Sequence, residues 1–227
     1  FPLYFSVLTT YFFLYIDRYF VFYNIGYERF AIYGAAITAS MIFINIPQYV
    51  ITALLPYFSS MYTSNKSEFF SLFKRIIRIV CITFVPSIIL ISMLAQPLIF
   101  IFAGEKYVSS WYIFFIVTLT VGIAFPYAIL SSYFLAKGES KVILYGTIVS
   151  ILTGAILVQS LYKYYEIIGA AYGRALMFLT FFIFLALWIY FKDKIDYGVK
   201  FHISSIFLSL VLFSPVIIIS LFFYTNI

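Results

Sequence analysis

Runs of apolar residues, each long enough to cross a bilayer, follow one another along almost the whole chain. A helix needs roughly 20 mostly apolar residues to span the hydrocarbon core. Seven segments meet this requirement: residues 2–23, 34–60, 78–103, 111–136, 142–162, 167–191 and 201–224. Because backbone polar groups must be satisfied within lipid, such segments fold as helices. The sequence therefore predicts an all-α polytopic membrane protein, with about seven transmembrane helices in one domain, residues 1–227.

The scarcity of charge agrees with this class. Charged residues make up 10% of the 227 residues and hydrophobic residues 65%, whereas a soluble domain has about 25% charged residues. No loop between the apolar segments is long enough for a soluble catalytic domain. The net charge of +6 comes mainly from Lys and Arg in short loops, a position that predicts contact with anionic lipid headgroups and no nucleic-acid partner.

The loop charges also predict an orientation, because cytoplasmic loops retain an excess of Lys and Arg. One set of alternate loops contains nine such residues: Lys66, Lys74, Arg75, Arg78, Lys137, Lys141, Lys192, Lys194 and Lys200. The other set contains three: Arg29, Lys106 and Lys163. The first set is therefore predicted to be cytoplasmic, which places the C-terminus of a seven-span chain outside.

The longest of the predicted cytoplasmic loops, residues 65–78, has the pattern of an amphipathic helix. Asn65 and Glu68 have the spacing of a capping pair at its start. Its apolar face predicts a helix lying on the inner leaflet. An ordinary connector with a solvated polar face is an equal alternative.

Polar residues recur at helical spacing in the first two segments. The first stripe comprises Ser6, Thr10, Asp17 and Asn24, and the second Thr38, Asn45, Gln48, Thr52 and Ser59. We expect both stripes to face the same interior, because a purely lipid-facing helix needs no polar stripe. Single Ser and Thr residues are accounted for by interhelical hydrogen bonds. Asn45 and Gln48, on either side of Pro47, fit a hydrated cavity and simple packing equally well.

Three charged residues lie inside apolar segments: Asp17, Arg18 and Arg174. Each costs about 2.5–3.5 kcal/mol at a helix centre on the insertion scale. We therefore expect these three charges to have interactions or a function that offset this cost. Asp17 is predicted to face a cavity. For Arg18 and Arg174, a cavity role and an anchor that snorkels to the interface remain alternatives.

Enzyme and metal-site motifs are missing from the sequence. His202 is the only histidine and Cys81 the only cysteine, so one chain cannot supply a multi-histidine metal site or a histidine-paired catalytic group. There is no glycine-rich phosphate loop. We therefore expect a protein that is not an enzyme and needs no cofactor or metal.

Six short stretches, in order along the chain, carry a family resemblance: IDRYF (16–20), YGAA (33–36), ALLPYFSSMY (53–62), PLIFIFAGEKYVSSW (97–111), YFLAKGESK (133–141) and EIIGAAYGRA (166–175). The chain resembles the C-terminal half of polysaccharide-transport (Wzx-type) flippases. Their superfamily also contains multidrug and toxic compound extrusion antiporters and peptidoglycan-precursor flippases.

This resemblance implies a transporter of two six-helix bundles, sometimes with two more helices, around a central cavity. The chain would match the seventh helix onward and would lack the first bundle. An outside C-terminus departs from the family's cytoplasmic end, so we expect a fragment or a missed final span. The resemblance also implies that Arg18 and Arg174 contact a lipid-linked pyrophosphate sugar.

The function implied is transport across the cytoplasmic membrane of a lipid-linked oligosaccharide, by alternating access coupled to H⁺ or Na⁺. An ion-coupled multidrug or organic cation antiporter is the nearest alternative, and it needs a carboxylate-rich cavity, for which the sequence offers only Asp17. An integral-membrane glycosyltransferase would need acidic residues in a large outer loop, where only Glu28, Glu105 and Glu166 are available. A structural membrane subunit is the remaining alternative.

Overall fold

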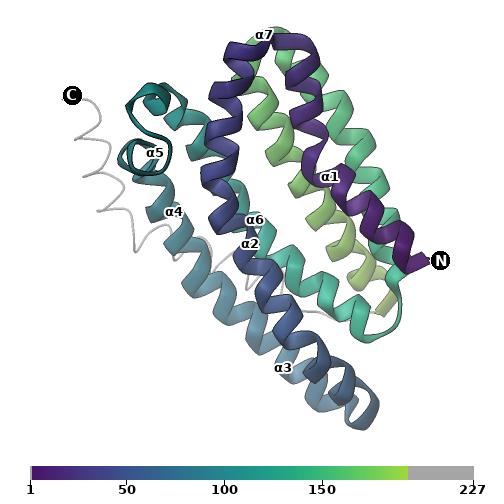
Figure 1. The fold of residues 1–227 in the computed structure, drawn as a ribbon. Coiled ribbons are helices and arrows are strands. Elements are labelled where there is room, and N and C mark those ends of the chain that lie inside the picture. The colour runs from purple at the N-terminus through teal and green to yellow at the C-terminus, as the bar shows by residue number, and fades with distance from the viewer. Residues whose placement is uncertain (1, 194–227) are drawn as a thin grey trace.

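The computed structural model describes residues 2–193, and this part of the chain folds into a bundle of helices (Figure 1). Four helical stretches in the described part are long and apolar enough to cross a membrane: Tyr27–Ser64, Lys66–Met93, Glu105–Ala136 and Ser140–Lys192. The prediction of an all-α, multi-pass membrane protein is confirmed. The predicted seventh span, 201–224, lies outside the described residues.

Helix α1 (Pro2–Ile25) and helix α2 (Tyr27–Ser64) are separated only by Gly26, whose φ of 83° is in the region that favours glycine. Although α1 has 24 residues, it does not reach the hydropathy of the four stretches, because it contains Asp17, Arg18 and several tyrosines. Helix α2 contains Pro47 and Pro56 and still continues for 38 residues.

The next stretch begins as α3 (Lys66–Ile79), passes through a π-helical turn (Val80–Phe84) and continues as α4 (Val85–Met93). Pro86, in the first turn of α4, has no N–H to donate to the preceding turn. The π-helical turn lies directly before this proline, where the regular hydrogen-bond ladder is interrupted. Helix α5 (Ala95–Ala103) and a 3-10 helix (Glu105–Ser110) then lead into α6 (Trp111–Ala136).

Helix α7 (Ser140–Trp188) consists of two antiparallel arms that reverse direction at Glu166, as Figure 1 shows. The predicted segments 142–162 and 167–191 correspond to these arms. Glycines permit their close contact: a Cβ on Gly154 would lie 2.7 Å from the Met177 sulfur, and one on Gly173 would lie 2.5 Å from Val158 Cγ2. Gly169 and Gly173 form a GxxxG pair, and a Cβ at either position would lie within 3 Å of the first arm, so the pair permits close packing.

The connections gather at two ends of the bundle. At one end, Phe69 and Phe73 of α3 contact Tyr133 near the end of α6, with ring centroids 5.8 and 5.0 Å apart. At the same end of α6, Glu139 pairs with Lys137 at 3.3 Å and with Lys192 at 3.6 Å. The described parts of the three basic loops therefore share one end, as their charge pattern predicts.

At the opposite end, Arg29 at the start of α2 forms an ion pair with Glu166 at the reversal of α7. The Tyr162 hydroxyl also donates a hydrogen bond to the Asn24 carbonyl at 3.2 Å. These two contacts join the turn between α1 and α2 to the tip of α7. That this end faces outward stays a prediction.

Helix α3 is amphipathic, and its start is as predicted, because the Asn65 side chain accepts a hydrogen bond from the Glu68 backbone N–H at 3.3 Å. Its apolar face does not lie on a leaflet. Phe69 and Phe73 are fully buried, and Phe69 packs against Phe58 of α2 as well as Tyr133. Aromatic side chains of α2 and α6 thus cover the apolar face. Of the two alternatives that the sequence left open, the connector with a solvated polar face is the one that fits, because Lys74, Arg75 and Arg78 are exposed. Figure 1 shows α3 running beside the end of α2.

Candidate functional site: a buried charge cluster

Asp17 joins three helices inside the bundle. Its side chain is fully buried, and its Oδ1 accepts a hydrogen bond from Arg174 Nη1 at 2.8 Å. Its Oδ2 accepts a hydrogen bond from the Tyr33 hydroxyl at 2.6 Å. The carboxylate thus connects α1 with α2 and with the second arm of α7. We call Asp17, Arg18, Tyr33 and Arg174 the charge cluster.

The three bonded residues meet because they lie at similar depth. At about 1.5 Å per residue, Asp17 is about 12 Å from the end of α1, Tyr33 about 9 Å from the start of α2 and Arg174 about 12 Å from Glu166. All three helix ends belong to the same end of the bundle. The short turn at Gly26 and the reversal at Glu166 therefore place the cluster about two helical turns from this end of the bundle.

Arg174 is the largest fully buried side chain among the described residues. Besides Asp17, its Nη1 contacts the Leu14 carbonyl at 3.0 Å, and its guanidinium carbon lies 5.3 Å from the centre of the Phe178 ring. Its Nε and Nη2 are buried and find no hydrogen-bond partner within residues 2–193. Because a buried cation requires an anion, Asp17 is the group that makes this position possible.

Arg18 adds a second cation beside the ion pair. Its side chain is half-buried, and its guanidinium carbon lies 5.1 Å from the centre of the Tyr15 ring. Asp17 and Arg174 are both close enough to act on it electrostatically. Its Nε and Nη2 are also buried and without a partner in the described chain. Two guanidinium groups beside one carboxylate give the cluster a formal charge of +1.

The sequence predicted three members of the cluster and missed Tyr33. Asp17, Arg18 and Arg174 were identified as charges within apolar segments, and the structure brings them together. Tyr33 is one of 22 tyrosines and carries no charge, so nothing in its local sequence distinguishes it. Only the approach of α2 to α1 reveals its bond to the carboxylate.

Asn45 and Gln48 are not part of the cluster. Both are exposed on α2, as are Thr38 and Thr52. An α-helix advances about 100° per residue, so Asn45 lies about 120° and Gln48 about 60° around α2 from the buried Tyr33. Asn45 and Gln48 therefore lie away from the charge cluster. Because Thr10 and Asn24 of the first stripe are exposed as well, the expectation that the two stripes face a common interior stays a prediction.

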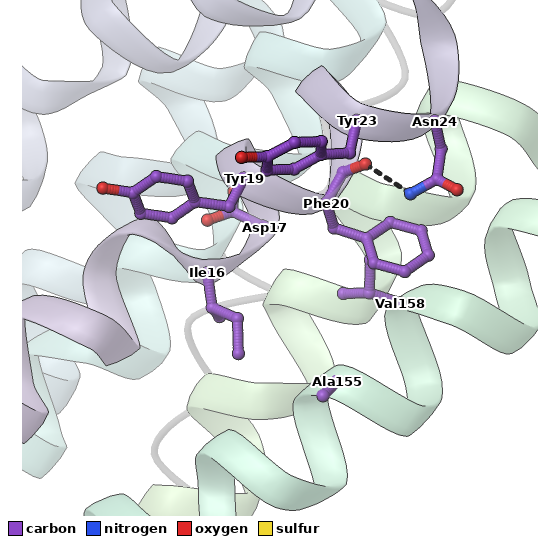
Figure 2. A pocket seen from close by; sticks show the side chains of 8 residues that line it. All are labelled: Ile16, Asp17, Tyr19, Phe20, Tyr23, Asn24, Ala155 and Val158. Carbon is purple, nitrogen blue, oxygen red and sulfur yellow. Dashed lines mark hydrogen bonds between the residues drawn. The ribbon is translucent and has the colours of Figure 1, made fainter.

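A pocket of about 290 Å³ lies between α1 and the first arm of α7 (Figure 2). Its lining is mostly apolar and includes Asp17, which it shares with the charge cluster. The Asn24 amide at its rim donates to the Phe20 carbonyl at 2.8 Å. The lining residues are Ile16, Asp17, Tyr19, Phe20, Tyr23, Asn24, Ala155 and Val158.

Comparison with known protein families finds a match over the first part of the chain. Residues 1–112 match the model of a family described as "Polysaccharide biosynthesis protein". This range runs from α1 to the start of α6 and contains Asp17, Arg18 and Tyr33, but not Arg174. The match supports a family that acts in polysaccharide biosynthesis or export. Neither the curated proteins nor the solved structures gave a significant match.

Proposed function

We propose that the chain is the C-terminal bundle of a two-bundle transporter that flips a lipid-linked oligosaccharide across the cytoplasmic membrane. The observation that carries this proposal is the charge cluster, a site of formal charge +1 inside the spanning helices of a multi-pass protein. A role in polysaccharide synthesis or export is supported independently by the family match. A lipid-linked sugar with a pyrophosphate group is the substrate whose charge suits this cluster.

The two arginines have the chemistry needed to hold a pyrophosphate. Guanidinium groups form strong, charge-assisted hydrogen bonds with phosphate oxygens. Arg174 is fixed through Nη1 by Asp17 and the Leu14 carbonyl, which leaves Nε and Nη2 for a ligand. Arg18 is half-buried and would meet the headgroup first.

Asp17 supplies a way to couple binding to movement. The substrate's phosphates compete with the carboxylate for Arg174, and loss of that pair loosens the junction of α1, α2 and α7. Protonation of Asp17, or Na⁺ bound at it, weakens its attraction to Arg174 in the same way. Either ion can therefore shift the bundle between states in an alternating-access cycle.

The pairing of Asp17 weighs against the cation antiporter. Such a transporter needs a carboxylate that is free to bind a cation, whereas both oxygens of Asp17 are already bonded to Arg174 and Tyr33. A glycosyltransferase would need catalytic acidic residues in the outer loops, where the candidates are Glu28, Glu105 and Glu166. Of these, Glu166 is paired with Arg29.

Translocation by the full-length protein tests the proposal. The protein is reconstituted in vesicles with a fluorescent polyprenyl pyrophosphate oligosaccharide, and an impermeant quencher reports which leaflet holds it. We expect Arg18→Gln to slow translocation at least tenfold without lowering protein abundance. Lys106→Gln serves as the matched control, because it also removes one cation but lies outside the charge cluster. Translocation no faster than in protein-free vesicles, or equal for wild type and Arg18→Gln, would contradict the proposal.

A further inference from the structure

The ion pair between Asp17 and Arg174 uses only one nitrogen of the guanidinium group. Arg174 Nη1 donates to Asp17 Oδ1 at 2.8 Å and to the Leu14 carbonyl at 3.0 Å. Arg174 Nε and Nη2 are buried and have no hydrogen-bond partner within residues 2–193. Arginine and a carboxylate frequently form two parallel bonds instead, in which both carboxylate oxygens accept from one guanidinium. A neighbouring group must therefore keep this pair from closing in that way.

Tyr33 is the neighbour that occupies the second carboxylate oxygen. Its hydroxyl donates to Asp17 Oδ2 at 2.6 Å, and both side chains are fully buried. Asp17 Oδ2 is thereby satisfied by a residue of α2 and makes no hydrogen bond to Arg174 Nη2. Without this hydroxyl, Oδ2 would be a buried acceptor that lacks a partner, and such groups are costly.

Arg174 is the donor that an unsatisfied Oδ2 would take. Rotation of the carboxylate toward Nη2, with Oδ1 still at Nη1, gives the common two-bond geometry. Arg18 also has buried nitrogens without a partner in the described chain. However, Arg18 is next to Asp17 on α1, and adjacent side chains of a helix do not face each other. The new bond would therefore use up Nη2, which is one of the two free nitrogens of Arg174.

We propose that Tyr33 is a positioning residue, which keeps Arg174 open to an anion by holding Asp17 Oδ2. The inference rests on the proposed function, because that function assigns the free nitrogens of Arg174 to a pyrophosphate.

The position of Tyr33 on α2 couples this helix to anion binding. Asp17 belongs to α1 and Arg174 to α7, so movement of α2 away from α1 withdraws the hydroxyl from the pair. The carboxylate then takes Nη2 and displaces the anion. By linkage, a bound anion favours the position of α2 in which Tyr33 contacts Asp17.

Binding of inorganic pyrophosphate to the full-length protein in lipid nanodiscs tests the positioning role. Tyr33→Phe should lower the affinity at least about tenfold, because one charge-assisted hydrogen bond to the anion is lost. Tyr127→Phe is the matched control. Its ring lies against the same Phe178 ring as the Arg174 guanidinium, but neither Asp17 oxygen is bonded to it. This control should leave the affinity unchanged.

Replacement of Tyr33 by 4-aminophenylalanine keeps a donor at the same end of the ring and should restore the affinity. A purely structural role of the ring would be served equally well by phenylalanine. Equal affinity in the wild type and Tyr33→Phe, or no recovery with the amino group, would overturn the inference.

A second measurement does not depend on the proposed function. Thermal unfolding of Asp17→Asn, Arg174→Gln and the double variant gives the coupling between these two residues. The coupling should be larger in the Tyr33→Phe background than with Tyr33 present, because two bonds then join the pair. A coupling that is equal or smaller there would show the inference to be wrong. A larger coupling in a protein that binds no pyrophosphate would contradict the proposed function and leave the control of the pair by Tyr33 in place.

Discussion

Asp17 has the most demanding environment of any single residue in the described chain. It is an anion within the spanning part, and it is stable there because Arg174 and Tyr33 occupy both of its oxygens. Such a pair contributes little to stability compared with a well-packed apolar pair, but breaking it leaves a charge buried alone. Removing one partner should therefore destabilise the fold much more than replacing both partners by apolar residues.

The substitution Asp17→Asn should consequently destabilise the protein by about 3–5 kcal/mol, because Arg174 is left as an unpaired buried cation. Tyr33→Phe removes one hydrogen bond to a charged group and should cost only about 1.5–3 kcal/mol. Thermal unfolding in detergent measures both. The double variant Asp17→Asn with Arg174→Gln should be more stable than Asp17→Asn alone. If it is less stable, the two residues are not coupled as the structure indicates.

At the scale of elements, the α7 hairpin depends on the absence of side chains at the contact between its arms. The position that a Cβ on Gly173 would take is 2.5 Å from Val158 Cγ2 and 2.7 Å from Val158 Cα. The second of these atoms is backbone and cannot rotate away. The arms must therefore move apart if this glycine is replaced.

We expect Gly173→Ala to lower the stability of the protein by about 1–3 kcal/mol through overpacking. Gly34→Ala is the control, because a Cβ at Gly34 meets nothing within 4 Å. In α2 this alanine should be neutral or stabilise by up to about 1 kcal/mol, since glycine is a poor helix former. The unfolding temperatures of the two variants test this prediction. An equal decrease in both would show that the close contact at Gly173 does not hold the arms together.

The tip of the same hairpin is strained. Glu166 has φ 49° and ψ −130°, a conformation that side chains rarely adopt. Its ion pair with Arg29 has side chains that are 51% and 63% exposed, and an exposed pair contributes at most about 1 kcal/mol. The strain costs about 1–3 kcal/mol, so the pair offsets only part of it.

Glu166→Gly should therefore stabilise the protein, by up to about 2 kcal/mol, because relief of backbone strain outweighs loss of the pair. Glu166→Gln keeps the strain, loses the ion pair and should be destabilised by less than about 1 kcal/mol. Chemical denaturation at low and high salt separates the two effects. A Glu166→Gly protein less stable than Glu166→Gln would contradict the assignment of strain to this residue.

At the scale of the whole molecule, the connections are sorted by charge between two ends. This arrangement predicts cytoplasmic exposure of the α2–α3 and α6–α7 connections. In a Cys81→Ser background, which removes the buried native thiol, cysteines at Ser67 and Lys141 should resist an impermeant maleimide added to intact cells. A cysteine at Lys163, at the opposite end, should react. The reverse pattern would invert the topology and leave the fold unchanged.

The sequence predicts the helical class and most reversal points, because both follow from local composition. The segment predicted at 78–103 is the exception, because the structure continues the stretch from Lys66 to Met93 and starts a new helix at Ala95. Apolar segment length identifies the helices, and the charges within those segments identify Asp17, Arg18 and Arg174. What it could not give is which face of each helix is buried. For the apolar face of α3 the sequence left the inner leaflet open as one of two alternatives, because apolar character does not distinguish a protein neighbour from the bilayer. Tyr33 was missed for the same reason, since its role depends on a partner from another helix.

The loopless reversal of α7 has a consequence for how the chain is made. Because the arms are separated by a single non-helical residue, we expect them to insert together, as a helical hairpin. Few polar groups have to pass through the hydrocarbon core in that event, chiefly Lys163 and Glu166 near the tip. Since each charge costs about 2.5–3.5 kcal/mol at the centre of the core, a longer, more polar tip would hinder membrane insertion even where the finished fold could accommodate it.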